Sequence, residues 1–297
     1  MKDQIIHALA ADDQVRIVAI SGANMIEKAR QIHHLSRVCT AALGRQMLMT
    51  AMMGSQLKNA TDRVSTIIKG DGPAGNMVCT ANPDCCVKAY MANPETELAP
   101  TAEGKLDVGG LVGHTGKLTV IRDLSMKEPY VGTCNLISGE IAIDFAEYYT
   151  ASEQHPSLVY LGVRVNIEDG TVRAAGGMLV QPLPGCAEET IDRMAALSQA
   201  IGRLSARLDG NETLEDILFD VFGEEQIHRT AAFDTAYRCD CSRRRIEQAL
   251  ISIGKKDLTE MIEEDGKAEV TCQFCNQVYR FTREELLDLL QEAEGET

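Results

Sequence analysis

The chain has 297 residues and a formal net charge of −15, and its composition, 44% hydrophobic and 25% charged, is ordinary for a globular protein. Apolar runs stay well short of the roughly 18 residues that span a bilayer, and the N-terminus lacks the apolar core of a signal peptide, so we expect a cytoplasmic protein with no membrane partner. The acidic charge repels phosphate backbones and argues against general nucleic-acid binding.

Residues 1–183 have the pattern of one α+β domain. An alternating stretch from Gln14, QVRIVAI, predicts a strand, and the next two segments, 24–36 and 37–58, have helical periodicity. Short β-type runs separated by Gly, Pro, Asn and Asp turns follow at 63–70, 75–82, 85–92, 117–123 and 130–138. A helix and two strands joined by the turn EDG complete the pattern, which predicts a mainly antiparallel sheet with packed helices.

The sequence PLPG at 182–185 closes this domain, because its two prolines interrupt both helix and strand ladders. Beyond it we expect residues 184–235 to form an amphipathic helical linker, with 4 Lys+Arg against 11 Asp+Glu in 186–235. One helix face over 186–210 carries apolar residues at steps of three and four, namely Ile191, Met194, Leu197, Ile201, Leu204 and Leu208. A second helix, over 212–223, has on one side the apolar residues Leu214, Ile217, Leu218, Val221 and Phe222.

Both linker helices need a partner surface, because so narrow an apolar stripe does not stabilise an isolated helix in water. The natural docking surface is the sheet of the first domain. Periodicity alone favours a permanently packed connector over a switchable element.

Residues 236–297 have the pattern of a small compact domain. Its predicted elements are a helix from Ser242 through Ile253, a helix with the capping box Asp257/Glu260, a hairpin of strands at 268–272 and 277–282, and a final helix with the capping box Thr282/Glu285. The apolar content of this domain is small for independent stability, so we expect an additional staple.

Four cysteines in this domain follow the pattern C-x-C, thirty residues, C-x-x-C, and are Cys239, Cys241, Cys272 and Cys275. In a reducing compartment, closely spaced thiols indicate metal ligands or redox groups rather than permanent disulfides. Four thiolates complete the tetrahedral shell of Zn²⁺, and the C-x-x-C half lies in a predicted turn that points both sulfurs the same way. We therefore expect one structural Zn²⁺ per chain. Because four protein ligands leave no position for water, hydrolytic metal catalysis is disfavoured and no enzyme activity is expected.

Oxidation of these thiols is the basis of a redox hypothesis, since the spacing within each pair makes local disulfides accessible. A structural zinc contributes on the order of 10 kcal/mol of folding free energy in a small metallo-domain. A disulfide that closes a loop of about four residues recovers only about 2 kcal/mol. Oxidation that expels zinc is therefore expected to unfold residues 236–297, and the linker, deprived of its docking partner, to expose apolar surface.

The segments YRCDCSRRRIEQAL and CQFCNQVYRF, together with GEIAIDFAEYYTASEQ and VRAAGGMLVQPLPG in the first domain, closely resemble the bacterial 33 kDa heat shock protein family of redox-regulated chaperones. The resemblance covers essentially the whole chain and includes all four metal positions. It implies an ATP-independent holdase that is inactive while reduced and zinc-bound. Under oxidative stress, often combined with heat, such proteins form disulfides, release zinc, unfold the zinc domain and the linker, and bind unfolding client proteins.

Carried over to this chain, the resemblance implies the disulfides Cys239–Cys241 and Cys272–Cys275 and a homodimer in the oxidised state. The linker is then both the relay and part of the client-binding region. Its candidate client-binding residues are Ile191, Met194, Leu197, Ile201, Leu204, Leu208, Leu218 and Phe222. Acidic charge keeps the unfolded segment in solution, while the apolar stripe offers contacts to clients.

Two other functions agree with parts of the pattern. A zinc-ribbon nucleic-acid-binding module usually has two C-x-x-C pairs about 15–20 residues apart and a basic surface. Residues 236–297 instead contain 9 Lys+Arg and 14 Asp+Glu, and the basic run at 243–245 is expected to be a solvated helix face. A thiol-disulfide oxidoreductase has its C-x-x-C at a helix N-terminus in a βαβ setting, whereas Cys272 and Cys275 lie between two predicted strands.

The remaining cysteines are expected to be buried, inert thiols, and are Cys39, Cys79, Cys85, Cys86, Cys134 and Cys186. The adjacent Cys85 and Cys86 are expected on opposite faces of a strand, which opposes a bond between them. Ser152, Glu153 and His155 superficially suggest a catalytic set. Their crowding at a helix end before a proline favours capping instead.

Overall fold

The computed structural model describes residues 2–223 and 226–295. The chain divides into two compact units, residues 1–238 and 239–297. The first unit includes the expected linker segment, so the division of the chain into three domains at residues 183 and 235 stays a prediction. Among the residues described, no helix is long and apolar enough to cross a membrane.

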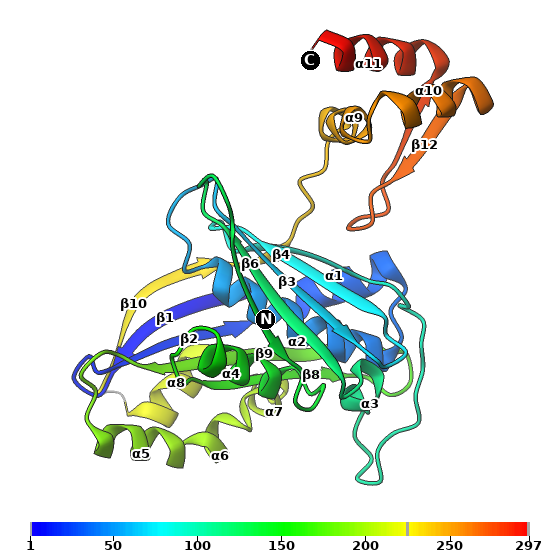
Figure 1. Ribbon diagram of the computed structural model, residues 1–297. Coiled ribbons are helices and arrows are strands. Elements are labelled where there is room, and N and C mark those ends of the chain that lie inside the picture. The colour runs from blue at the N-terminus through cyan, green and yellow to red at the C-terminus, as the bar shows by residue number, and fades with distance from the viewer. Residues whose placement is uncertain (1, 224–225, 296–297) are drawn as a thin grey trace. The chain divides into compact units, whose positions relative to one another are not determined.

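Two sheets form the framework of the first unit (Figure 1). The five-stranded sheet comprises β1 (Gln4–Ala10), β2 (Val15–Ser21), β8 (Leu158–Val165), β9 (Val172–Pro182) and β10 (Ile227–Asp234), in the order β10-β1-β2-β9-β8. The six-stranded sheet comprises β3 (Arg63–Gly70), β4 (Asn76–Ala81), β5 (Cys86–Met91), β6 (Gly116–Asp123), β7 (Tyr130–Asn135) and β11 (Ala236–Tyr237), in the order β11-β5-β4-β3-β6-β7. All strand pairs are antiparallel except β11 with β5. This arrangement confirms the α+β class and the mainly antiparallel sheet.

Helix α2 (Arg37–Gly54) contacts strands of both sheets. Sixteen of its 18 residues are buried, as expected of a helix that is apolar on all sides. Close approach requires Gly44, because a Cβ atom there would lie only 2.9 Å from Ile26 and 3.0 Å from Val163. Three shorter helices complete this part of the unit, α1 (Ala23–His33), α3 (Val108–Val112) and α4 (Ala142–Ala151).

The opposite face of the five-stranded sheet is covered by the linker helices, α5 (Glu188–Ala196), α6 (Ser198–Ile201), α7 (Leu204–Asp209) and α8 (Leu214–Phe222) (Figure 1). The expected docking of the linker on the sheet of the first domain is thus confirmed. The single helix expected over 186–210 is instead broken into three. The absence of a side chain at Gly176 of β9 lets Leu204 and Leu208 of α7 pack directly on the strand. Ser205 of α7 also hydrogen-bonds the hydroxyl of Tyr160 at 2.8 Å.

Two strands of the five-stranded sheet were not expected from the sequence, β1 and β10. β10 pairs with β1 at the edge of the sheet, and six of its eight residues are exposed. A strand that is exposed on both faces has no apolar alternation, so β10 gives no pattern to detect. Residues 227–234 of the expected helical linker are therefore strand.

The second unit has a small core. Its elements are α9 (Arg243–Ser252), α10 (Lys255–Glu264), β12 (Lys267–Thr271), β13 (Val278–Thr282) and α11 (Arg283–Gly295). The core consists of seven buried residues among those described, Leu250, Leu258, Ile262, Ala268, Phe281, Leu286 and Leu289. So few apolar side chains agree with the expectation of an additional staple.

The helix starts of the second unit test the capping predictions. The Ser242 hydroxyl accepts from the backbone of Arg245, which confirms the start of α9. The backbone of Thr282 donates to Glu285 and that of Glu285 donates to the Thr282 hydroxyl, which confirms the last capping box. The capping box expected at Asp257 and Glu260 is wrong, because the N-terminal cap of α10 is Gly254, three residues before Asp257.

Candidate metal centre

Each half of the cysteine cluster is positioned by its own local structure. Cys272 and Cys275 lie in the connection between β12 and β13, where the backbone N–H of Cys275 and that of Asn276 both donate to the carbonyl oxygen of Cys272. Asn276 adopts a left-handed conformation, which allows the chain to turn back tightly into β13. Cys239 and Cys241 precede α9 directly.

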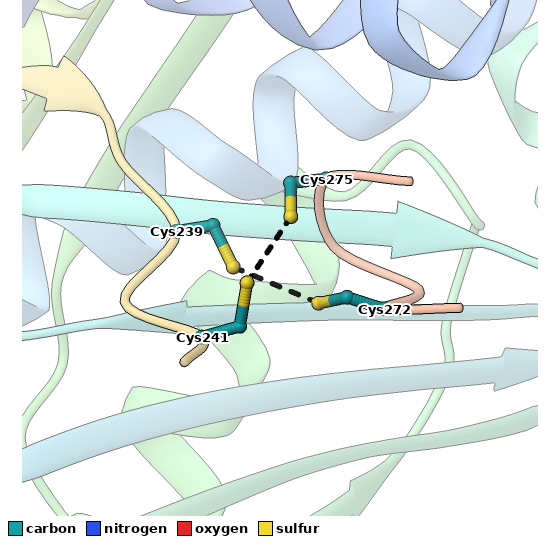
Figure 2. A group of neighbouring side chains, drawn as sticks. All are labelled: Cys239, Cys241, Cys272 and Cys275. Atoms are coloured by element: carbon teal, nitrogen blue, oxygen red, sulfur yellow. Dashed lines mark hydrogen bonds between the residues drawn. The ribbon is translucent and has the colours of Figure 1, made fainter. Parts of the chain in front are cut away.

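The four sulfur atoms lie within 4.8 Å of one another (Figure 2). The Sγ atoms of Cys239 and Cys272 are 3.7 Å apart, and those of Cys241 and Cys275 are 3.4 Å apart. A tetrahedral zinc with Zn–S bonds of about 2.3 Å requires sulfurs separated by about 3.8 Å. The cluster therefore has the dimensions to hold one metal ion with four thiolate ligands. Cys272 is buried and the other three are half-buried.

Burial and hydrogen bonds shift the pKa values of three of the four thiols in different directions. Burial raises the pKa of Cys239 and, to a smaller extent, that of Cys275. The pKa of Cys241 is lowered, because hydrogen bonds, first from the hydroxyl of Tyr279 and then from the neighbouring thiols, outweigh its burial. The Tyr279 hydroxyl donates to the Cys241 sulfur at 3.1 Å. Cys241 thus ionises more readily than Cys239 or Cys275, and metal binding favours deprotonation of all four.

Arginines around the centre are engaged within the second unit. Arg245 pairs with Asp240, the residue between Cys239 and Cys241, and also donates to its carbonyl oxygen at 3.0 Å. Arg243 pairs with Glu285 at 2.7 Å and lies 4.3 Å above the ring of Phe281. The basic run at 243–245 is exposed, as expected, but two of its members hold α9 to neighbouring segments.

Tyr279 is the residue of this centre that sequence reasoning missed. It lies opposite Val270 in the hairpin, and this register brings its hydroxyl to Cys241. A tyrosine in a strand is ordinary, so composition gives no signal. The hairpin register combined with the position of the C-x-x-C turn is the signal that was available.

The candidate client-binding residues of the linker divide by burial. Met194, Ile201, Leu204, Leu208 and Leu218 are buried, and Leu197 and Phe222 are half-buried. Ile191 does not follow its expected stripe and is 43% exposed, because α5 docks through Thr190 and Met194. Their part in client binding stays a prediction.

The cysteines outside the cluster are buried except Cys186, which is half-buried. Burial raises the pKa of Cys85 to about 12 and that of Cys134 to about 11, so both are held as neutral thiols at physiological pH. The expectation that Cys85 and Cys86 share a strand is wrong. Cys85 adopts a left-handed conformation just before β5, which begins at Cys86.

Ser152, Glu153 and His155 make separate structural contacts. Ser152 is the C-terminal cap of α4, and its backbone N–H donates to the carbonyl oxygen of Tyr148, so the expected capping role is confirmed for this residue. Its hydroxyl donates to the carbonyl oxygen of Thr133. Glu153 accepts from the hydroxyl of Tyr148 at 2.6 Å, and His155 bonds the carbonyl oxygen of a proline in β9. No common site for catalysis follows from these contacts.

Comparisons with known proteins extend over nearly the whole chain. The family model described as Hsp33 protein matches residues 3–282. The 33 kDa chaperonin of Clostridioides difficile (strain 630) is 41% identical over 292 residues, which are 98% of this chain and 100% of that protein. The 33 kDa chaperonin of Alkaliphilus oremlandii (strain OhILAs) is also 41% identical, over 98% of this chain and 97% of that protein.

A solved structure agrees with this fold. The crystal structure of the 33 kDa chaperonin (heat shock protein 33 homolog) from Thermotoga maritima superposes with a TM-score of 0.86 at 34% identity, covering 99% of this chain and 100% of that chain. Three findings agree with the resemblance found in the sequence: the family match over residues 3–282, the α+β fold shared with the Thermotoga maritima protein, and the four-thiol centre. The chain therefore belongs to the Hsp33 family of chaperones.

Proposed function

We propose that this protein is an ATP-independent holdase of the cytoplasm, not an enzyme, that is switched on when its zinc-bound cysteines are oxidised. In the reduced state one Zn²⁺ is held by Cys239, Cys241, Cys272 and Cys275. The oxidised protein acts as a homodimer that binds unfolding clients, without nucleic acid or membrane. The observation that carries this proposal is the four-sulfur cluster, which lies in a unit with only a small apolar core.

Zinc is the metal that this ligand set favours, since four thiolates in a tetrahedron are typical of structural zinc sites. When bound, the ion contributes folding free energy and performs no chemistry of its own. The neighbouring residues stabilise the thiolate ligands and their loop. Tyr279 stabilises the Cys241 thiolate, and Asp240 with Arg245 holds the loop between the first two cysteines.

The pairing of the cysteines decides whether oxidation unfolds the second unit. Each disulfide forms when two thiols lose two electrons to an oxidant such as peroxide, which leaves as water. Pairing within C-x-C and within C-x-x-C closes loops of a few residues and recovers about 2 kcal/mol each. Pairing Cys239 with Cys272 and Cys241 with Cys275 closes loops of about 34 residues and recovers about 4 kcal/mol each by the same relation. We propose the neighbour pairs, Cys239–Cys241 and Cys272–Cys275, because they recover the smaller part of the folding free energy that zinc supplies and so destabilise the unit most.

The position of the linker adds a second requirement for activation. Its apolar face packs on the five-stranded sheet of the first unit. The chain between the linker and Cys239 is anchored in that unit too, since Thr235 donates to the carbonyl oxygen of Cys85 and Tyr237 to that of Ala89. Loss of zinc leaves these contacts in place. A further destabilising influence, such as heat, is therefore expected to act together with oxidation to free the linker and expose both apolar surfaces.

One experiment tests the proposal directly. Reduced and peroxide-treated protein are compared, at low and elevated temperature, for zinc content and for suppression of aggregation of a chemically unfolded client. We expect zinc release and holdase activity to rise together, with neighbour disulfides found by peptide mapping. Cys186→Ser, which removes a half-buried thiol outside the cluster, is the matched control and should behave as the parent. Zinc release without any holdase activity would refute the proposed function.

A further inference from the structure

The linker helices do not fill the space above the five-stranded sheet. A hollow of about 320 Å³ lies between them and the strands. Its walls are mostly apolar and include Ala10 and Val15 of the sheet, Met194 and Leu197 from the α5 segment, and Val221 and Phe222 of α8. A cavity of about 150 Å³ lined by aliphatic side chains accommodates benzene. This hollow is about twice as large and is in the range of natural small-ligand sites.

The orientation of α5 keeps the hollow open. Thr190 lines the hollow, and the next residue, Ile191, is the large apolar one. Ile191 points to solvent and is 43% exposed. Thr190 is buried in its place. A smaller, branched polar residue thus occupies the position where the amphipathic pattern predicts packing, and space remains beside it.

One charged residue lines the hollow, Arg193. Its guanidinium donates to the side-chain oxygen of Gln226 at 3.0 Å, and within the described ranges no carboxylate forms an ion pair with it. An apolar space whose wall contains a cation with no carboxylate partner among the described residues has the character of a site for an amphipathic anion. The cation fixes the charged end and the apolar walls take up the body of the molecule.

We propose that this hollow is a binding site for a small amphipathic monoanion, such as a medium-chain or aromatic carboxylate. The apolar body lies between α5, α8 and the strands, and the carboxylate pairs with Arg193. The site consists of residues from the linker and from the sheet together, so it exists only while the linker is docked.

Binding to the docked state alone stabilises that state by mass action. At a free ligand concentration ten times the dissociation constant, the ratio of docked to undocked linker rises about elevenfold. Provided that the proposed function is correct, the ligand then delays activation by oxidant and heat. The site itself does not depend on that function.

Binding is tested by titration calorimetry on the reduced, zinc-loaded full chain, with octanoate and the uncharged octanol as probes. We expect one octanoate per chain, bound about two- to fivefold more tightly than octanol, as for an exposed ion pair. Arg193→Gln should remove this preference. Thr190→Leu fills part of the hollow and should weaken both probes severalfold. Ile191→Leu, at the exposed position next to it, is the control and should change neither.

A second variant keeps the test decisive if Thr190→Leu disturbs folding. Met194→Ala enlarges the hollow and should shift the preferred chain length from octanoate toward decanoate, with each added methylene increasing affinity by about fourfold. The proposal is overturned if neither probe binds, or if octanoate binds equally to the parent, Arg193→Gln and Met194→Ala chains with unchanged length preference.

Regulation is tested separately by adding octanoate during peroxide activation at elevated temperature. We expect slower onset of aggregation suppression in the parent and no delay in Thr190→Leu. If octanoate binds but onset is unchanged, the regulatory consequence fails and the site stands. If the oxidised protein never suppresses aggregation, the proposed function fails, and the calorimetry alone then decides on the site.

Discussion

The two faces of the five-stranded sheet are covered in different ways. On one face, α2 is buried along nearly its whole length between two sheets, in a continuous core that includes α1 and most strands. On the other face, four short helices of four to nine residues make up the linker layer. Two hollows, of about 320 and 380 Å³, lie within this layer or at its border with β10.

This difference shows how one sheet can have a permanently packed helix on one face and detachable helices on the other. A helix buried on all sides cannot leave without opening both sheets, whereas short helices that dock by one face can detach singly. The predictions below test whether the two faces really differ in this way.

The largest effect is expected from removal of the metal. Chelation with EDTA or the change Cys272→Ser should cost the second unit on the order of 10 kcal/mol, which a core of seven residues cannot offset. Hydrogen exchange should show loss of protection in residues 239–295 and, at low temperature, retained protection in α2 and in α5–α8. On heating the metal-free protein, α5–α8 should lose protection before α2. Simultaneous loss in α2 and the linker would contradict the proposed difference between the two faces.

In the packed core, Leu48→Ala tests the first half of the comparison. Leu48 of α2 is fully buried, and its truncation should destabilise the first unit by about 4 kcal/mol because the surrounding sheets cannot close the cavity. Urea unfolding followed by circular dichroism should show one shifted transition for the whole unit. A separate early transition confined to α2 would show that this helix is no more integrated than the linker.

In the linker layer, Leu218→Ala tests the second half. Leu218 is buried but borders the hollow of about 380 Å³, so its neighbours can relax and the cost should be about 2 kcal/mol, at the low end for leucine truncation. The loss of hydrogen-exchange protection should be confined to α5–α8. Under the proposed function, this variant should also suppress client aggregation with less oxidant than the parent.

Phe219→Ala is the matched control for the linker variant. Phe219 is the next residue of α8 but is 38% exposed, and it lies outside the apolar cluster that holds the linker. Its replacement should leave both the exchange pattern and the oxidant requirement nearly unchanged. Equal effects of the two substitutions would mean that surface hydrophobicity of α8, rather than docking, controls the response.

The four-cysteine cluster and most strands could be predicted from the sequence because their signals are local. Ligand spacing and apolar alternation depend on residues a few positions apart, and Cys239, Cys241, Cys272 and Cys275 do come together. Large parts of the antiparallel sheets were predicted for the same reason.

Other features depend on partners that are distant in sequence. A periodicity argument predicts the apolar face of the linker, but neither its division into α5, α6 and α7 nor the close packing of α7 on Gly176 of β9. The outward position of Ile191 follows from how α5 docks. β10 is held by pairing with β1, since its own exposed residues carry no alternation. Tyr279 acquires its role only through the hairpin register.

A smaller effect is expected from Tyr279→Phe, which removes the hydroxyl that donates to Cys241. The pKa of Cys241 should rise, and zinc affinity should fall about tenfold at neutral pH, as is typical for loss of a hydrogen bond to a metal ligand. Competition with a chromogenic chelator measures this affinity. Tyr130→Phe, at an exposed tyrosine of β7, is the control. Unchanged zinc affinity in Tyr279→Phe would show that this hydrogen bond does not tune the centre.

The smallest effect concerns Glu27, which ties α1 to the packed face of the sheet. The pKa of Glu27 is lowered, mainly by the hydrogen bond from Arg30. Partial burial raises this pKa, but a further hydrogen bond from the backbone N–H of Val172, at the start of β9, lowers it again. Because the carboxyl group has a lower pKa folded than unfolded, its contribution is present above the unfolded pKa, near 4.5, and disappears as the pH falls through the folded value.

Glu27→Gln should therefore lower stability by about 1 kcal/mol at pH 7, a modest amount because the ion pair is partly solvated. The difference between Glu27→Gln and the parent should shrink progressively as the pH falls below 4.5. Urea unfolding at a series of pH values measures it, with Glu95→Gln at an exposed position as the control. A pH-independent difference would mean that the side chain of Glu27 acts through its shape, and that its charge does not measurably stabilise the first unit.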